Sequence, residues 1–361
     1  MKTAGILTFH RAHNYGAVLQ CYALKEVLRR NGVDVKVIDY RQPQIEENYK
    51  YRYKITQKSL NSIKDVIVLL REHAANLYHL YLHIKRERYF LNFQNRFLNL
   101  SDKCIEDTIP SYDIYVIGSD MLWDDHCMMG KFEKIYWGDF KHRTDSIVIG
   151  YAISGSKASL SRCKEMTNFS FFKNFSALSV REESLSSYIK ECTNIELPVC
   201  LDPTLLADRA IWDEIIDERL ANRKFIVTYY IRVNEEDIRH IDTKVKALAR
   251  EMKCEVININ GHHPLRIETF VSILKFSKYL VTDSFHGVVF SSIFQRPFNA
   301  IRLNDSHDER YVDLMKKLNI ENLIVEKDFT PNVPIIDYDK VDQSLALLRE
   351  RSLSFLKENV K

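Results

Sequence analysis

The sequence predicts an α/β protein with two doubly wound parallel sheets. Short apolar runs of strand length alternate with helical periods along most of the chain, and this alternation is typical of parallel sheets. The length of 361 residues is enough for two domains. We expect an N-terminal domain over residues 1–205 and a C-terminal domain over residues 206–361, facing each other across a cleft.

The composition is that of an ordinary soluble globular protein, with 45% hydrophobic and 28% charged residues. The net charge of +3 does not indicate a nucleic-acid partner. The seven cysteines form no CxxC pair and no metal-ligand spacing, which indicates reduced thiols, a cytoplasmic location and no metal site. No apolar run reaches the roughly 20 residues that a membrane span requires. The short apolar run at the N-terminus is expected to be a strand, not a signal peptide.

The first strand–helix unit carries polar groups where a ligand is expected. Strand, polar loop and helix are predicted at 4–9, 10–16 and 17–30, and a second strand follows from residue 33. Ligands of parallel sheets bind at the carboxyl ends of strands, which is where this loop lies. Asn14, Tyr15 and Gly16 would place donors at a helix N-terminus and allow a ligand to approach closely. The alternative is a helix N-cap followed by a turn glycine.

Residues 41–100 differ from the rest of the first domain and are expected to form a helical insertion. They hold 11 Lys or Arg and 5 Asp or Glu, with aromatic residues interleaved. The part from Ser59 to Leu100 is predicted to form one or two long helices. Such a basic, aromatic stretch can bind an anionic membrane surface. The alternative is a solvated face over an aromatic core contact.

Several later strands of the first half end in polar residues. Strands are expected at 112–117, 147–152, 177–180 and 199–201. The polar residues that follow them include Ser119, Asp120, Ser154 and Arg181. Arg181 is the most informative of these, because a guanidinium at a strand end can hold a carboxylate or phosphate through two hydrogen bonds. The alternative for Arg181 is an ion pair with Glu182, Glu183 or a neighbouring helix.

The second half repeats the strand–helix alternation. Strands are expected at 225–231, 256–259, 279–282, 298–303 and 323–325. Helices are expected at 211–220, 234–252, 267–276, 287–294 and 307–318. A final amphipathic helix at 338–358 is predicted to pack back on the N-terminal domain.

The stretch 278–301 contains the strongest candidate for a reactive group. A buried strand is followed by a five-residue turn and then by a helix that is apolar all round. Ser284 and Gly287 lie at the start of this helix, where free backbone N–H groups favour an anion. His286 beside such a site can act as a general acid and base. The alternative is that His286 caps the helix or satisfies a buried carbonyl.

Several segments, in order, resemble the polysaccharide pyruvyl transferase family. They are NYGAVLQCYALKEVLRRNG (14–32), YDIYVIGSDMLWDD (112–125), GYAISGS (150–156), LSVREESLSSYIKE (178–191), VCLDPTLLADRAIW (199–212), TDSFHG (282–287) and a downstream RPF with Arg310. Each motif is weak alone, whereas the ordered set is specific and covers almost the whole chain. The resemblance implies two Rossmann-like domains in a GT-B-like arrangement, with the active site in the cleft.

The resemblance also implies a reaction. Members transfer pyruvate from phosphoenolpyruvate to a sugar of a bacterial capsular or exopolysaccharide, or its lipid-linked precursor, forming a ketal and releasing phosphate without a cofactor. By position, His286 matches the family's histidine and Arg181 the arginine of its R-E-x-S pattern. Asp120 would hold the acceptor hydroxyls or take their proton. The expected location is the cytoplasm, with peripheral contact at the inner face of an anionic membrane.

The chain departs from the family pattern in two places. Many members have Arg-Leu before the histidine, where this chain has Ser284 and Phe285; the missing cation is expected to come from Arg302 or Arg310. Many also have glutamine where this chain has Met121. Two other functions fit the sequence: a GT-B glycosyltransferase that uses a nucleotide sugar, and a non-catalytic sugar-binding assembly protein.

Overall fold

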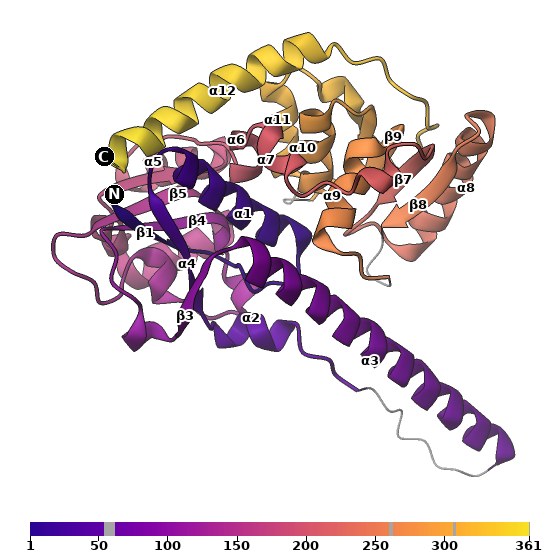
Figure 1. Ribbon diagram of the computed structural model, residues 1–361, viewed down its shortest axis with the longest axis horizontal. Coiled ribbons are helices and arrows are strands. Elements are labelled where there is room, and N and C mark those ends of the chain that lie inside the picture. Colours follow the sequence, from indigo (N-terminus) through magenta and orange to yellow (C-terminus); the bar gives the residue numbers. More distant parts are fainter. Residues whose placement is uncertain (54–61, 260–262, 306–307, 361) are drawn as a thin grey trace.

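The computed structural model describes residues 1–53, 62–259, 263–305 and 308–360, and contains two all-parallel sheets (Figure 1). The predicted class, α/β with two parallel sheets, is therefore confirmed. Both faces of each sheet are buried. Ile6 and Leu7 of one strand enter different apolar clusters, as do Ile226 and Val227 in the other sheet. Helices thus cover both faces, as in doubly wound folds.

The first sheet has the strand order β3-β2-β1-β4-β5-β6. Its strands are β1 (Thr3–Leu7), β2 (Asp34–Tyr40), β3 (Leu100–Cys104), β4 (Ile114–Trp123), β5 (Ile147–Gly155) and β6 (Ala177–Val180). The order reverses between β1 and β4, which pair from Ala4 opposite Ile114. A reversal of this kind opens a crevice at the carboxyl ends of the two strands.

The second sheet has the order β11-β10-β9-β7-β8. Its strands are β7 (Phe225–Tyr229), β8 (Glu255–Ile259), β9 (Tyr279–Thr282), β10 (Phe298–Ile301) and β11 (Ile324–Val325). Here the order reverses between β7 and β9, where Tyr229 lies opposite Thr282. The second crevice is therefore expected beside the residues that follow Thr282.

Twelve α-helices lie within the described residues. They are α1 (Tyr15–Arg30), α2 (Pro43–Asn48), α3 (Ile63–Phe97), α4 (Lys157–Thr167), α5 (Glu183–Thr193), α6 (Pro203–Leu206), α7 (Arg209–Asp213), α8 (Glu235–Glu251), α9 (Ile267–Phe276), α10 (Phe285–Phe294), α11 (Glu309–Lys317) and α12 (Tyr338–Asn359). Almost every residue of α10 is buried, which explains its lack of a polar face.

Two predicted helices are shorter than expected. The helix expected to reach Leu100 ends at Phe97, and Asn99 then adopts a positive φ of 51°. Leu100 instead begins the edge strand β3, which the sequence did not predict; Ser59 lies outside the described residues. The helix expected at 211–220 is α7 followed by a separate 3-10 turn at Glu218–Leu220.

Residues 118–120, predicted as a loop, lie inside β4. The strand continues to Trp123 and pairs with β5 beyond this point. Gly118 has a φ of +129°, and its Cα is so close to Tyr151 that an added Cβ would lie 2.1 Å from the Tyr151 carbonyl oxygen. Asp120 also has a positive φ, of 86°. The irregular backbone at 118–120 therefore directs Asp120 differently from a regular strand residue.

The two sheets share one apolar core. Tyr22 of α1 donates a hydrogen bond to the Ile211 carbonyl at 3.2 Å, and Trp212 packs edge-on against Phe290 of α10 at 4.9 Å. The helix α12 runs from the second sheet across to the first (Figure 1). There Ser352 Oγ accepts the Leu201 N–H at 2.9 Å. The core cluster accordingly includes strands of both sheets.

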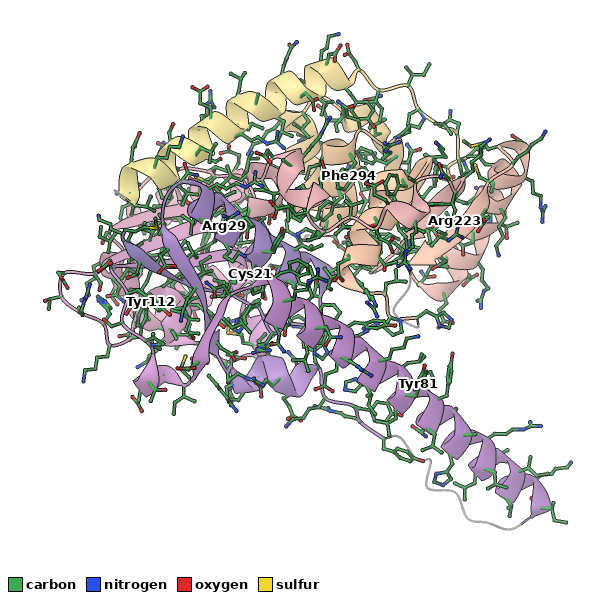
Figure 2. The ribbon with its side chains drawn as sticks, in the orientation of Figure 1. Cys21, Arg29, Tyr81, Tyr112, Arg223 and Phe294 are labelled. Atoms are coloured by element: carbon green, nitrogen blue, oxygen red, sulfur yellow. The ribbon has the colours of Figure 1, made fainter. Side chains whose placement is uncertain are left out.

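The helix α3 projects from the body of the molecule (Figure 1), and Figure 2 shows its side chains around Tyr81 extending beyond the core. Only Phe90, Phe93 and Gln94, near its C-terminal end, are buried. Its exposed apolar residues include Ile63, Val66, Ile67, Leu70, Leu77, Tyr78, Tyr81 and Ile84. At 100° per residue these positions fall on one face, whereas Val68, which is 40% exposed, lies off this face. We call this face the α3 stripe.

Candidate active site

His286 of the second sheet lies directly against the N-terminus of α1 in the first. A Cβ atom at Gly16 would lie 2.1 Å from His286 Nδ1, so no side chain fits at Gly16 while the imidazole is in place. Asn14 is the N-cap of α1 and accepts the Ala17 N–H at 3.2 Å. Asn14 is therefore a helix N-cap, which was the alternative interpretation. A glycine is needed at position 16 because His286, about 270 residues away in sequence, approaches it closely.

The residues around His286 are held by the ends of two neighbouring strands. Ser284 is the N-cap of α10 and accepts the Gly287 N–H at 3.4 Å. The Asp283 carboxylate accepts the backbone N–H groups of residues 231–233 at 2.7, 2.6 and 2.9 Å. These bonds tie the loop after β7 to the loop after β9. The helix starts two residues earlier than predicted, so His286 lies in its first turn.

Arg181 is buried at the end of β6 and is paired on two sides. Its Nε donates to Glu182 at 2.8 Å, and its Nη1 donates to Asp202 at 2.8 Å. Ser154 Oγ donates to the same Glu182 oxygen at 2.7 Å. The guanidinium lies 5.0 Å from the ring centroid of Phe285. The ion pair considered from the sequence is therefore present, and it fixes the direction of the guanidinium.

Arg310 and Asp120 complete a charged cluster around His286. Burial lowers the pKa of His286, the nearby charges of Arg181 and Arg310 lower it further, and Asp202 and Asp120 oppose them. Arg310, on α11, also donates to the sulfur of Met121 at 3.3 Å. Of the two arginines expected to supply the missing cation, Arg310 is thus the one beside His286. We call His286, Arg181, Arg310 and Asp120 the charged cluster.

Three polar atoms in and beside this cluster are buried without a hydrogen-bond partner in the described structure. They are Arg181 Nη2, Glu182 Oε2 and His286 Nε2. Buried polar atoms are nearly always paired, and the exceptions concentrate where a ligand or an ordered water binds. The cluster therefore offers an unused donor on Arg181 and an unused ring nitrogen on His286.

A pocket of about 180 Å³ adjoins the cluster between α11, α12 and the loop after β6. Arg181, Phe285 and Arg310 line it, whereas His286 does not. Lys317 and Arg351 add positive charge to its wall. The pocket therefore extends the charged cluster on the side of the two arginines.

Three other residues predicted to belong to the site lie outside the charged cluster. Ser119 is fully buried and donates to the Ala152 carbonyl at 2.6 Å. Tyr15 donates to the Leu265 carbonyl at 3.2 Å and stacks on Phe270 at 4.2 Å, so it links the two halves. Arg302 is exposed after β10. These side chains are engaged in packing or face solvent, and the structure does not bring them into the cluster.

Sequence reasoning missed Asp202 and underestimated Glu182. Asp202 is not among the site residues expected from the sequence, yet it pairs with Arg181 and caps α6 through the Thr204 N–H at 2.9 Å. The position of Asp202 could have indicated its role, because Asp202 directly follows an apolar run in the same way that Arg181 directly follows β6. Their pairing depends on how residues 199–202 lie beside β6, where Val199 bridges Val180.

The model of the family described as polysaccharide pyruvyl transferase matches residues 14–305. The chain belongs to the polysaccharide pyruvyl transferase family. It is therefore a transferase, and the charged cluster lies within the matched region apart from Arg310. No curated protein matches the chain.

Solved structures resemble this pyruvyl transferase family member at low identity. UDP-GlcNAc 2-epimerase from Methanocaldococcus jannaschii has 13% identity and a TM-score of 0.46, with 97% of this chain and 93% of that one covered. The Neisseria meningitidis enzyme bound to UDP-GlcNAc has 12% identity and a TM-score of 0.47, with 99% and 93% covered. An E. coli heptosyltransferase has 10% identity and a TM-score of 0.33, with 85% and 90% covered.

No helix in the described ranges has the length and apolar character needed to cross a bilayer. Within the same residues, no group of three or more His, Cys, Asp or Glu side chains could hold a metal ion.

Gly16→Ala should reduce turnover by displacing His286. The added methyl group must move the imidazole or the start of α1, at a cost of about 1–3 kcal/mol in the free energy of unfolding. The control is Gly32→Ala, where an added Cβ meets nothing within 4 Å but φ is +83°. Both variants should melt at lower temperature, and only Gly16→Ala should lose turnover per folded molecule. Normal turnover in Gly16→Ala would show that the contact does not position His286.

The pKa of His286 should lie below about 6.5, the ordinary value for histidine. This pKa can be measured by NMR from the pH dependence of the His286 imidazole signal, which is identified by its absence from His286→Gln. Arg310→Gln should raise this pKa, because the charge of Arg310 lowers it. The control, Arg302→Gln, removes an exposed arginine and should leave the pKa unchanged. A midpoint at or above 6.5 in the unmodified protein would contradict the proposed surroundings of His286.

Proposed function

We propose that this transferase moves pyruvate from phosphoenolpyruvate to a sugar of a bacterial capsular or exopolysaccharide, or of its lipid-linked precursor. The product is a pyruvate ketal bridging two hydroxyls, and phosphate is released. The observation that carries the proposal is the charged cluster, in which two arginines adjoin a histidine and both Arg181 Nη2 and His286 Nε2 lack partners. Family membership supplies the reaction class.

The donor suits the cationic side of the cluster. Phosphoenolpyruvate carries a carboxylate and a phosphate, and guanidinium groups bind both through charge-assisted hydrogen bonds. Arg181 is held rigidly by Glu182 and Asp202 and still has Nη2 to donate. Arg310 adds a second charge, and the first turn of α10 adds free N–H groups. Together these groups supply the positive charge that an arginine provides in many family members at the position of Ser284.

The proposed chemistry needs one proton carrier and one group that orients the acceptor. A sugar hydroxyl adds to C2 of phosphoenolpyruvate, and its proton passes through His286 to C3. A second hydroxyl then attacks C2, and the C2–O bond to phosphate breaks. The proton of this second hydroxyl leaves with the phosphate. The lowered pKa of His286 keeps the ring neutral and able to accept the first proton. Asp120 hydrogen-bonds the attacking hydroxyls.

The acceptor side includes a membrane contact made by α3. The α3 stripe exposes large apolar side chains, including Leu70 at 63% and Leu77 at 60%. The surrounding region 41–100 is rich in Lys and Arg, so anionic headgroups would be attracted while the apolar side chains insert. Charge complementarity therefore favours an anionic bilayer as the occupant of this face, where a lipid-linked acceptor would be presented.

The direct test is phosphate release from phosphoenolpyruvate with a glycan acceptor. Phosphoenolpyruvate should also raise the melting temperature, because a ligand that binds only the folded state stabilises it by mass action. UDP and GDP sugars should not. If a nucleotide sugar raises the melting temperature and phosphoenolpyruvate does not, the proposed reaction is wrong and glycosyl transfer is favoured. The appearance of a pyruvate methyl signal in the product glycan would identify the ketal.

His286→Gln should lower turnover by about two to four orders of magnitude, the usual contribution of general acid–base catalysis. Glutamine keeps hydrogen bonding and approximate volume but cannot carry the proton. Turnover and thermal melting should be measured on one preparation, with His240→Gln, an exposed residue of α8, as control. A stable variant with near-normal turnover would remove His286 from the reaction.

Leu70→Ser combined with Leu77→Ser should abolish sedimentation of the protein with anionic vesicles. Binding by the unmodified protein should weaken with salt, because exposed charges are screened. Leu347→Ser is a matched control, since Leu347 of α12 is 62% exposed but lies outside the α3 stripe. Vesicle binding that is absent, or unaffected by the paired substitution, would exclude the α3 stripe as the contact.

A further inference from the structure

A second pocket lies where α3 meets the body of the molecule. Its volume is about 530 Å³, larger than the pocket beside Arg181. It is lined by His13, Asn48, Tyr49, Lys50, Tyr51, Arg52, His83, Arg86 and Met129. We call it the α3-base pocket. Neither the family motifs nor the proposed reaction uses these side chains.

The lining of the α3-base pocket is positively charged. Lys50, Arg52 and Arg86 contribute cations, and none of the described residues in the lining is a carboxylate. The pocket beside Arg181, in contrast, has acidic and basic groups in its wall. Glu47, outside the lining, pairs with Lys50 at 2.6 Å and approaches Arg52 at 3.7 Å. The three cations of the lining exceed the one carboxylate that pairs with two of them, so this part of the wall carries a net positive charge.

Aromatic rings form the rest of the wall. His13 lies 5.1 Å from Tyr49 and 5.3 Å from Phe90, and Tyr51 lies 5.7 Å from His83, measured between ring centroids. Tyr51 also donates to the Asn76 carbonyl of α3 at 2.7 Å, which fixes the loop against the helix. His13 Nδ1 is buried and has no hydrogen-bond partner in the described structure. Rings beside cations suit a sugar that carries an anionic group.

The α3-base pocket lies near the start of α1, against which His286 packs. The charge of Asp120 acts on Tyr49 in this pocket, where burial and Asp120 raise the tyrosine pKa to about 12, and also on His286. His13 precedes Gly16, the residue under the His286 ring, by three positions. Arg86 acts electrostatically on Tyr229 at the end of β7. The pocket therefore lies near the start of α1, where His286 packs, and is separate from the pocket lined by the two arginines.

We propose that the α3-base pocket binds an anionic group of the acceptor glycan and so positions its hydroxyls toward Asp120 and His286. Phosphate in a glycosyl phosphate and carboxylate in an acidic sugar share the required chemistry. Arg86 supplies the principal charge, and the tyrosine rings contact the sugar. The proposal rests on the proposed function for the identity of the acceptor, but binding at the pocket can be measured without the reaction.

The test is calorimetric binding of glucose 1-phosphate, glucuronate and methyl glucoside to the full chain, in the presence and absence of phosphoenolpyruvate. Glucose 1-phosphate, glucuronate or both should bind in either condition, and methyl glucoside should bind at least about tenfold more weakly. Binding by only one anion identifies phosphate or carboxylate as the preferred group. Equal binding of methyl glucoside, or complete competition by phosphoenolpyruvate, would overturn the proposal.

Matched variants separate the pocket from the donor site. Arg86→Gln should weaken the anionic sugar by about tenfold and leave phosphoenolpyruvate binding unchanged. Arg86→Lys keeps the charge and should retain more affinity for the anionic sugar than Arg86→Gln does. Sugar binding by Arg86→Lys also shows that a substitution at this position leaves the fold intact. Arg88→Gln removes an exposed arginine of α3 outside the lining and should change neither affinity. Undiminished sugar binding in Arg86→Gln would overturn the assignment.

Failure of the proposed function would give a different pattern. Arg181→Gln should weaken phosphoenolpyruvate and leave the anionic sugar bound. If phosphoenolpyruvate does not bind at all, the proposed donor is wrong, and the effect of Arg86→Gln on the sugar still decides the role of the α3-base pocket. If Arg86→Gln weakens phosphoenolpyruvate as strongly as the sugar, Arg86 belongs to the donor site and this inference is wrong.

Discussion

The contact between His286 and Gly16 is the constraint on which the candidate site depends. It joins the strand-order reversal of one sheet to that of the other, so the two crevices meet at one place. Asp283 fixes the loop that carries His286 to the end of β7, and Asn14 fixes the start of α1 beneath it. The histidine is thereby positioned by backbone contacts from both halves, which is the kind of rigid support that catalytic groups require.

Buried charge is the second organising feature. Arg181 is enclosed by Glu182 and Asp202, and removing one member of such a group typically costs about 3–5 kcal/mol, because the remaining charge is left unpaired. The same carboxylates that stabilise Arg181 keep its guanidinium at one orientation. The ion pairs of Arg181 and the donor contact proposed for it therefore depend on the same orientation of the guanidinium, and the two interpretations of Arg181 are compatible.

Local patterns predicted much of the fold. The bounds of β6, β9 and α9 agree with the expected ones, because each is an apolar segment with clear breaks. The edge strand β3 was missed because LSDKC is short and polar, and its only described strand neighbour is β2. Pairing with β5 extends β4 beyond Gly118, which local sequence does not reveal. In the site, the TDSFHG turn was recognisable, whereas the approach of Arg310 and Gly16 depends on tertiary structure.

The apolar core shared by the two halves has a consequence for how the protein denatures. Leu356 near the C-terminus, Val18 of α1 and Phe290 of α10 belong to one cluster that spans both sheets. A core of this extent favours cooperative loss of both sheets in one transition, rather than independent melting of two units. Loss of a core side chain of α12, such as Leu356, would then reduce the fraction of folded molecules, although the charged cluster itself lies on other elements.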